Sequence, residues 1–327
     1  MRYRRLGKTG FNVSEISLGT WQVGGKWGEP FSNANADETI NTAIDSGINF
    51  IDTADVYNDG LSEKAIGRVL RTRSERVYVA TKCGRQLNPH VNEGYQPAVL
   101  RKFVEASLKN MNLDCLDLIQ LHCPPTQVYY RPEIFELFDT LKQEGKILNL
   151  GVSVEKPEEA LKALEYSNVC TAQIIFNMFR PRPSELFFKE AKRKDIGIIA
   201  RVPLASGMLT GKFSTGSKFS KDDHRNFNID GAAFDKGETF SGIDYTKGLE
   251  AVEKLKTIFP DQDLAAIALK WILMFDEISC VIPGASTSQQ SLSNLKALDL
   301  SNLSNDETEA VKAVYEKYIK YPVHFQW

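Results

Sequence analysis

Four titratable side chains of different kinds lie at the ends of short apolar runs in the first half of the chain. Asp52 ends one run and Tyr57 follows it, Lys82 ends the next, and His122 ends a third. A tyrosine is a poor acid or base at neutral pH unless a nearby cation lowers its pKa, which an ammonium does by about 1–3 units. Asp52 would keep the Lys82 ammonium charged, and His122 would donate a hydrogen bond. The set predicts proton transfer from Tyr57 to a carbonyl oxygen while another group delivers hydride.

Each of these residues also has an ordinary structural explanation when taken alone, such as a turn or cap for Asp52 and core packing for Tyr57. Four different titratable groups at the ends of three neighbouring strands favour a functional site. A metal site is not predicted, because His122 is the one histidine of four at a strand end. The five cysteines are odd in number and form no C-x-x-C pair, which predicts reduced thiols.

The elements that position these groups alternate along the chain. The predicted strands are Glu15–Gly19, Asn49–Asp52, Val77–Lys82, Leu116–His122, Asn149–Ser153, Ala172–Asn177, Gly197–Leu204 and Ile278–Pro283. The predicted helices between and after them are Asp37–Ser46, Ser62–Leu70, Pro97–Asn110, Glu133–Gln143, Pro157–Tyr166, Glu185–Lys194, Asp263–Phe275 and Gln289–Ala297. Continuous apolar strands joined by helices indicate a buried parallel sheet. Eight such units predict an α/β fold, a single (β/α)8 TIM barrel, with catalytic groups at the carboxyl ends of the strands.

Some segments fall outside this alternation. Tyr3–Leu6 and Phe11–Val13 predict an N-terminal hairpin that plugs the bottom of the barrel. The polar segment Gly211–Lys247 follows strand seven, and loops this long are usually functional or disordered. The extra helices Thr246–Phe259 and Asp306–Tyr318 complete the prediction, the second leading into an aromatic tail.

The composition is that of an ordinary globular chain: 327 residues, 42% hydrophobic and 25% charged, which excludes collagen-like, coiled-coil and wholly disordered classes. Forty Lys and Arg against 42 Asp and Glu leave a net charge of −2, which gives no electrostatic argument for a nucleic-acid or anionic-membrane partner. No apolar run approaches the roughly 18 residues of a spanning helix, and no signal peptide is apparent, so we expect a cytoplasmic protein. The sequence does not indicate an oligomeric state.

A dinucleotide fingerprint is not apparent. Gly19–Gly25 is glycine-rich, but no helix follows it and G-x-G-x-x-G is not matched. Barrels bind phosphates near the loops after strands seven and eight. Here these loops are Leu204–Lys212 and Pro283–Thr287, whose small residues and one lysine suit a pyrophosphate. A pair of ordinary glycine turns explains them equally well.

The ordered motifs of the chain resemble those of the aldo-keto reductases, most closely the bacterial general-stress type. The motifs are Phe50–Tyr57, Ala80–Lys82, Asp117–His122, Ile147–Ser153 and Ile282–Ala285. The resemblance covers nearly the whole chain and implies that residues 1–327 form one barrel domain with NADP(H)-dependent carbonyl reductase activity on small-molecule aldehydes or ketones. It implies Asp52, Tyr57, Lys82 and His122 as the catalytic residues, with Tyr57 as general acid. The candidate cofactor contacts, from the resemblance and from the two loops, are Gly19, Thr20, Trp21, Ser153, Gln173, Arg201, Leu204, Ser206, Gly207, Lys212, Gly284, Ser286, Thr287, Gln290 and Asn294.

The chain departs from the family pattern at several positions. Val154 stands where an Asn often follows the strand-five Ser. Arg201 stands where a Tyr usually stacks on the nicotinamide, and we expect it to pack on that ring or reach the phosphates; the alternative is that it pairs with a neighbouring carboxylate. Gly284 and Gln290 stand where basic residues often bind the 2′-phosphate, so NAD(H) is not excluded.

Two further expectations concern function. Trp21, Trp27, Tyr57 and the Tyr129–Tyr130 pair predict a pocket with aromatic walls, although scaffold packing explains such residues equally well. The alternative function is a non-catalytic nucleotide-sensing barrel that serves as an accessory or regulatory subunit. The complete catalytic set favours an enzyme.

Overall fold

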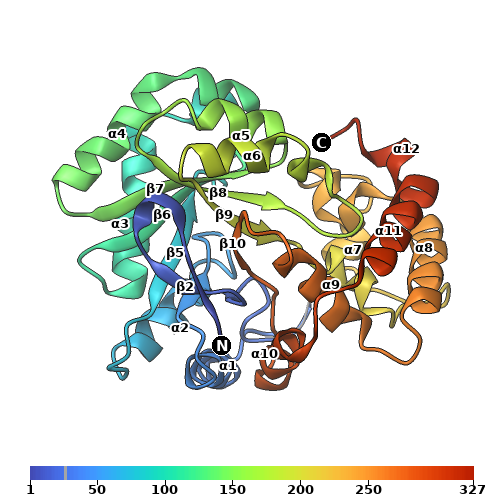
Figure 1. The fold of residues 1–327 in the computed structure, drawn as a ribbon. Helices are drawn as coiled ribbons and strands as arrows, with labels where there is room; N and C mark the ends of the chain where they lie inside the picture. Colours follow the sequence, from blue (N-terminus) through green and yellow to red (C-terminus); the bar gives the residue numbers. More distant parts are fainter. Residues whose placement is uncertain (26–27) are drawn as a thin grey trace.

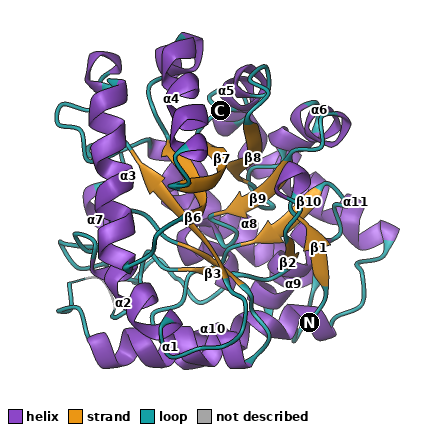
Figure 2. Cartoon of the chain, turned by 90° about the vertical axis from the view of Figure 1, so that its left-hand side faces the viewer, coloured by secondary structure: helices purple, strands orange, loops and turns teal. Residues whose placement is uncertain are grey.

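The computed structural model describes residues 1–25 and 28–327, and in these ranges eight parallel strands form one sheet in the order β10-β9-β8-β7-β6-β5-β4-β3. The strands are β3 (Leu18–Gly19), β4 (Phe50–Asp52), β5 (Tyr78–Cys83), β6 (Leu116–His122), β7 (Ile147–Val154), β8 (Val169–Ile175), β9 (Gly197–Arg201) and β10 (Ile278–Val281). Bridges from Ile16 to Val281 and from Gly19 to Gly284 join the two edges. The sheet therefore closes into a barrel surrounded by helices, as predicted (Figure 2).

A helix follows each barrel strand and covers the outside of the sheet (Figure 1). These helices are α1 (Asn33–Asp45), α2 (Leu61–Leu70), α3 (Pro97–Met111), α4 (Pro132–Gln143), α5 (Pro157–Ala163), α6 (Phe187–Arg193), α9 (Leu264–Leu273) and α10 (Ser288–Leu295). Proline occupies the first turn of α3, α4 and α5, where its missing N–H costs nothing. Helix α1 begins four residues earlier than predicted, because Ser32 caps it by accepting a hydrogen bond from the Asn35 N–H.

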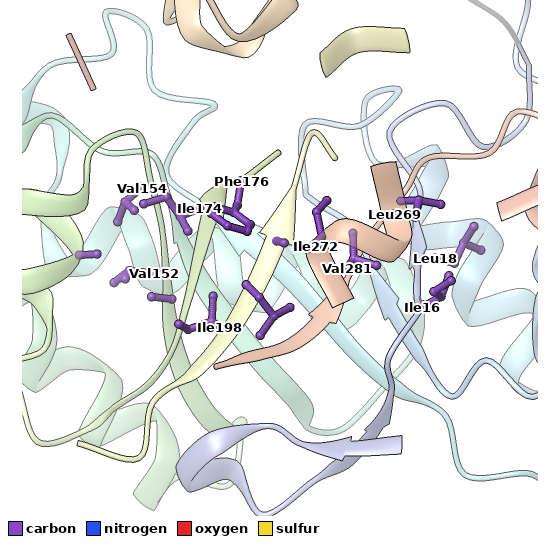
Figure 3. Close-up of a cluster of buried hydrophobic side chains, with 14 of the residues drawn as sticks. Ile16, Leu18, Val152, Val154, Ile174, Phe176, Ile198, Leu269, Ile272 and Val281 are labelled. Atoms are coloured by element: carbon purple, nitrogen blue, oxygen red, sulfur yellow. The ribbon is translucent and has the colours of Figure 1, made fainter. Parts of the chain in front are cut away.

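Two layers of apolar side chains hold the barrel together. Outward-facing residues such as Val152, Ile174 and Val281 pack against the helices (Figure 3). A smaller cluster fills the barrel interior and includes Phe50 and Leu118. All of these side chains are buried, so the barrel is a packed core and not a channel.

An antiparallel hairpin of β1 (Tyr3–Arg5) and β2 (Asn12–Ser14) closes the amino-terminal end of the barrel. Leu6 and Val13 of the hairpin are fully buried and belong to the interior cluster. A Cβ on Gly197, at the start of β9, would lie 2.7 Å from a Leu6 methyl carbon, so the hairpin is pressed against the strand ends. The predicted N-terminal hairpin is confirmed, and the cavity described below lies at the other end of the barrel.

The segment Gly211–Lys247 is folded rather than disordered. It contains α7 (His224–Phe227) and short 3-10 turns at Lys236–Glu238 and Phe240–Gly242. An aromatic cluster stabilises it, in which Phe219 lies 5.2 Å from Phe213 and 5.8 Å from Phe240 between ring centroids. The helix α8 (Tyr245–Ile258) follows it.

The C-terminal region packs beside this loop. The predicted helix Asp306–Tyr318 is divided into α11 (Asn305–Val314) and a π-helical turn (Tyr315–Ile319), followed by α12 (Lys320–Val323). Helices α8, α11 and α12 lie together on one side of the barrel (Figure 1). Trp327 returns to the loop, where its Nε1 donates to Asp235 Oδ1 at 2.6 Å. None of the helices in the described ranges has the length and apolar content that crossing a membrane requires.

Candidate active site

The parallel register brings the predicted catalytic side chains to one end of the barrel. The partner of Asp52 in β5 is Ala80, two residues before Lys82, and His122 of β6 lies beside Ser153 of β7. Asp52, Lys82 and His122 are therefore held together by strand ends, and Tyr57 is the one member of the set that lies in a loop, after β4.

Lys82 is the centre of this arrangement. Its Nζ donates to Asp52 Oδ1 at 2.5 Å, to the Thr53 carbonyl at 2.8 Å and to Tyr57 Oη at 3.3 Å. Its side chain is 1% exposed. Burial alone would lower the Lys82 pKa, but Asp52 and Tyr57 outweigh it and raise that pKa. The ammonium therefore stays charged inside the protein.

The Tyr57 pKa lies above its ordinary value, because burial of the phenol outweighs the lowering effect of Lys82. The sequence predicts a lowered Tyr57 pKa, because it indicates the Lys82 cation but not how deeply the phenol is buried. Tyr57 consequently keeps its proton at neutral pH, which is the state that a general acid requires.

His122 lies edge to face with Tyr57, with 6.0 Å between ring centroids. Burial, together with Arg85, Lys82 and Arg201, holds the His122 pKa well below its usual range. The imidazole is therefore neutral and carries one N–H, so it can donate a hydrogen bond without competing with Tyr57 as the acid.

Two amides hold the carboxylate of Asp52. Gln120 Nε2 donates to Asp52 Oδ2 at 3.0 Å, and Gln173 Nε2 donates to the same atom at 2.7 Å. Gln120 was not predicted as a site residue. A signal was present, since it is a polar residue in the middle of a strand that is buried along its whole length.

A cavity of about 400 Å³ extends from these groups across the end of the barrel. The predicted site residues that line it are Gly19, Thr20, Trp21, Asp52, Tyr57, His122, Ser153, Gln173, Arg201, Leu204, Ser206, Gly207, Lys212, Gly284, Gln290 and Asn294. Lys82, Ser286 and Thr287 lie outside the lining: Lys82 contacts Asp52 and Tyr57 from within the barrel, and Ser286 and Thr287 hydrogen-bond Gln290. Glu238, His224, Phe213 and Arg225 of the long loop also line the cavity and were not predicted.

The turn after β9 is the predicted pyrophosphate site. Ala205, Ser206 and Gly207 have φ angles of 47°, 57° and 93°, and in this left-handed turn the Ala205 and Gly207 N–H groups donate to the Val202 and Leu204 carbonyls. Val202, a β-branched residue, has φ of 50°, a strained conformation of the kind that clusters at functional sites. Lys212 lines the same side of the cavity. Ser206, Gly207 and the Lys212 cation, all on the cavity lining, suit the pyrophosphate of a nicotinamide dinucleotide.

Arg201 forms ion pairs with two buried carboxylates. Its guanidinium lies 2.9 Å from Glu155 Oε1 and 3.5 Å from Glu238 Oε2, and Arg85 lies 2.9 Å from Glu238 Oε1. This is the ion-paired alternative left open by the sequence, although Arg201 also lines the cavity. Cys123, Glu155 and Glu238 have possible metal-ligand atoms within 4.8 Å of one another. The Arg201 guanidinium contacts all three side chains and supplies the positive charge between them.

The two carboxylates of this cluster differ in acidity. Burial raises the Glu155 pKa to about 7, partly offset by Arg201. For Glu238, burial is outweighed by Arg85 and Arg201, which lower its pKa to about 2. Sequence periodicity does not indicate a role for either residue, because each carboxylate pairs with an arginine from a distant segment of the chain.

Asp55 is a further buried carboxyl group, 2% exposed, between the strand end and Tyr57. Burial and the nearby Glu63 raise its pKa to about 8, against weaker lowering by backbone N–H groups. Asp55 is therefore largely neutral at pH 7.

The aromatic wall is present in part. Trp21 lies 6.1 Å from Tyr57 and 4.8 Å from His224 between ring centroids. Tyr129 is buried, and Tyr130 is 64% exposed, and neither lines the cavity. Trp27 lies outside the described residues.

The fold and the site define a barrel oxidoreductase, and a comparison with protein families agrees. The model of the aldo/keto reductase family matches residues 15–316. The chain belongs to this family.

Named relatives are of similar length. The aldo-keto reductase YhdN of Bacillus subtilis is 31% identical over 84% of this chain and 81% of its own. The NADH-specific methylglyoxal reductase of Escherichia coli is 28% identical over 90% of this chain and 93% of its own. Among solved structures, a glycerol dehydrogenase from Gluconobacter oxydans is 29% identical, with a TM-score of 0.79 over 98% of this chain and 97% of its own.

Proposed function

We propose that this protein is a nicotinamide-dependent carbonyl reductase that converts small aldehydes or ketones to alcohols. The observation that carries the proposal is the Tyr57 hydroxyl, 3.3 Å from the buried Lys82 Nζ and beside the His122 ring, on the lining of a cavity of about 400 Å³. The names of two relatives, a methylglyoxal reductase and a glycerol dehydrogenase, support small carbonyl or alcohol substrates.

The bound cofactor would supply hydride to the carbonyl carbon. Ser153 and Gln173 would hold its carboxamide. Gln173 Nε2 already donates to Asp52, so its carbonyl oxygen is the group that would accept a hydrogen bond from the carboxamide. The turn at Ser206 and Gly207, with Lys212, would hold the pyrophosphate.

The side chains of the site provide the proton and stabilise the charge that its transfer leaves. Tyr57 Oη and the neutral His122 imidazole both donate hydrogen bonds to the substrate carbonyl oxygen. As negative charge develops on that oxygen, Tyr57 gives up its proton, and the Lys82 ammonium stabilises the phenolate that remains. Asp52 keeps Lys82 oriented. In alcohol oxidation the same groups act in reverse, with the phenolate as base.

The test is a panel of carbonyl compounds assayed separately with NADH and NADPH, following the loss of reduced-cofactor absorbance. Carbonyl-dependent oxidation of either cofactor supports the proposal. Binding of cofactor without turnover on any substrate would favour the nucleotide-sensing alternative, which the complete proton-transfer set disfavours. A cytoplasmic location and a single domain over residues 1–327 stay predictions.

A further inference from the structure

The cavity extends beyond the proton-transfer groups to a second end. There it reaches the start of α9 and the first turns of α10, and its lining residues are Ala265, Gly284, Gln290, Ser293 and Asn294. If the nicotinamide lies beside Tyr57, as the proposed function requires, the adenosine lies at this second end. NADP(H) differs from NAD(H) only by a 2′-phosphate on that adenosine, so the chemistry of this end decides between them.

Gln290 already occupies the hydrogen-bond donors of the turn before α10. Its Oε1 accepts from the Ser286 backbone N–H at 2.7 Å and from the Ser286 hydroxyl at 2.9 Å. A phosphate could use these donors only by displacing the Gln290 oxygen. The two hydrogen bonds that Gln290 makes would then be lost, which reduces the net gain from binding the phosphate. A neutral amide therefore fills the place that a 2′-phosphate would take.

The cations that line the described part of the cavity lie elsewhere or are paired. Arg201 is bound by Glu155 and Glu238, as described above. The Arg225 Nε lies 2.9 Å from Asp223 Oδ1, and its guanidinium packs 4.6 Å from the centre of the Phe219 ring. Lys212 belongs to the turn proposed to hold the pyrophosphate, where it faces two negative charges of its own.

A carboxylate stands near the adenosine end instead. Glu38 of α1 accepts a hydrogen bond from the Ser288 hydroxyl at 2.8 Å, in the first turn of α10. A phosphate monoester carries about −1.5 to −2 charge at neutral pH, and proteins usually meet it with arginine or lysine. A neutral ribose hydroxyl needs no cation, and side-chain amides such as those of Gln290 and Asn294 can serve it.

We infer that this end of the cavity does not select for the 2′-phosphate, so that NAD(H) binds at least as tightly as NADP(H), and that Gln290 is the residue that sets this preference. The inference rests on the proposed function. It differs from the dependence on NADP(H) that the family resemblance implies.

The test measures binding rather than turnover. NADH and NADPH are titrated into the full chain by quenching of tryptophan fluorescence, since Trp21 lines the cavity. Adenosine 5′-monophosphate and adenosine 2′,5′-bisphosphate are titrated by calorimetry, because they report on the adenosine end alone. We expect the Kd of NADH to equal or lie below that of NADPH, and the bisphosphate to bind no tighter than the monophosphate.

Two variants of one position complete the test. Gln290→Arg adds a guanidinium that can pair with a phosphate, so the Kd of NADPH and of the bisphosphate should fall by about tenfold while that of NADH changes by less than about threefold. Gln290→Met keeps the length of the side chain but removes the oxygen that occupies the Ser286 donors, and it adds no charge. The ratio of the two dinucleotide affinities should therefore move toward NADPH, but by less than in Gln290→Arg.

The outcomes separate this inference from the function on which it rests. A wild-type Kd for NADPH more than about threefold below that for NADH would overturn the inference, as would an unchanged affinity ratio in Gln290→Arg. Failure of both dinucleotides to bind would refute the proposed function itself.

Discussion

The Tyr57 hydroxyl holds a proton that the other titratable groups described beside it are not placed to replace. Lys82 is committed to Asp52, and His122 is neutral with a pKa well below its usual range. Tyr57→Phe keeps the ring and removes the proton, so kcat should fall by about 10²–10⁴. The Kd of the cofactor, measured by fluorescence, should change by less than about threefold, since the ring packing is kept. A variant with more than about a tenth of wild-type turnover would remove Tyr57 from its proposed role.

Asp55 makes the stability of the protein depend on pH. Its pKa is about 8 in the folded chain, well above the ordinary value near 3.8, so the folded state binds the proton more tightly. The stability that this provides is complete below the unfolded pKa and is lost as pH rises toward and through about 8. Asp55→Asn cannot ionise and avoids this loss.

The measurement for Asp55 is the free energy of unfolding of wild type and Asp55→Asn at pH 5, 7 and 9. The difference between them should shift in favour of the variant with rising pH, by on the order of a few kcal/mol in total. Parallel curves for the two proteins would show that Asp55 is not the group responsible. Glu75→Gln, at a surface carboxylate that is 54% exposed and pairs with Arg73, is the control: its pKa is lowered, so it stays ionised from pH 5 to 9 and its loss should leave the shape of the curve in place.

Site residues at strand ends could be predicted from the sequence, whereas those that depend on contacts between distant segments could not. Asp52, Lys82 and His122 stand at the ends of apolar runs, so periodicity alone placed them on one rim. Glu155 and Glu238 acquire their roles from Arg201, which pairs segments far apart in the chain. The sign of the Tyr57 pKa shift was missed for the same reason, because burial depends on everything packed around the phenol.

At the scale of elements, the Arg201 cluster joins β7, β9 and the long loop. Arg201→Met would leave Glu155 and Glu238 buried without this cation, and breaking a buried pair in this way typically costs about 3–5 kcal/mol. Without Arg201 the Glu155 pKa rises further above about 7, so the variant gains stability from protonation at low pH and loses it as pH rises. Its deficit relative to wild type should therefore be larger at pH 9 than at pH 6.

Urea denaturation of the Arg201→Met variant at both pH values checks this expectation. Arg193→Met is the matched control, because Arg193 pairs with Glu190 on the surface of α6 and is 64% exposed. Exposed pairs contribute about 0–1 kcal/mol, so this control should lose little at either pH. Equal losses for the two variants would contradict a structural role for the buried cluster.

The elements themselves follow the sequence closely where their signals are local. Strand β6 matches its predicted range Leu116–His122 to the residue, and α3 begins at Pro97 as predicted. The folded state of Gly211–Lys247 was not predictable in this way. Its order comes from Phe219 and its neighbours, and from Trp327, which binds Asp235 from the far end of the chain.

At the scale of the whole molecule, the hairpin plug and the active site lie at opposite ends of the barrel. Leu6→Ala would open a cavity among Val13, Phe50, Leu118 and their neighbours, and such truncations usually cost about 2–5 kcal/mol. The free energy of unfolding should fall by this amount while kcat at moderate temperature stays within about twofold, because no catalytic group contacts the plug. Leu186→Ala, at a side chain 54% exposed, is the control and should change neither quantity. A large loss of kcat in folded Leu6→Ala would show that the two ends communicate.

The position of Glu238 has a consequence for anyone who wishes to redesign this barrel. The loop that carries it is the natural segment to exchange for altered substrate preference, since its residues line the cavity. A transplanted loop without an equivalent carboxylate would take from Arg85 the partner it has in Glu238 and leave Arg201 with Glu155 alone. Randomised libraries should therefore keep Glu238 fixed and vary other positions of the loop that line the cavity, such as His224.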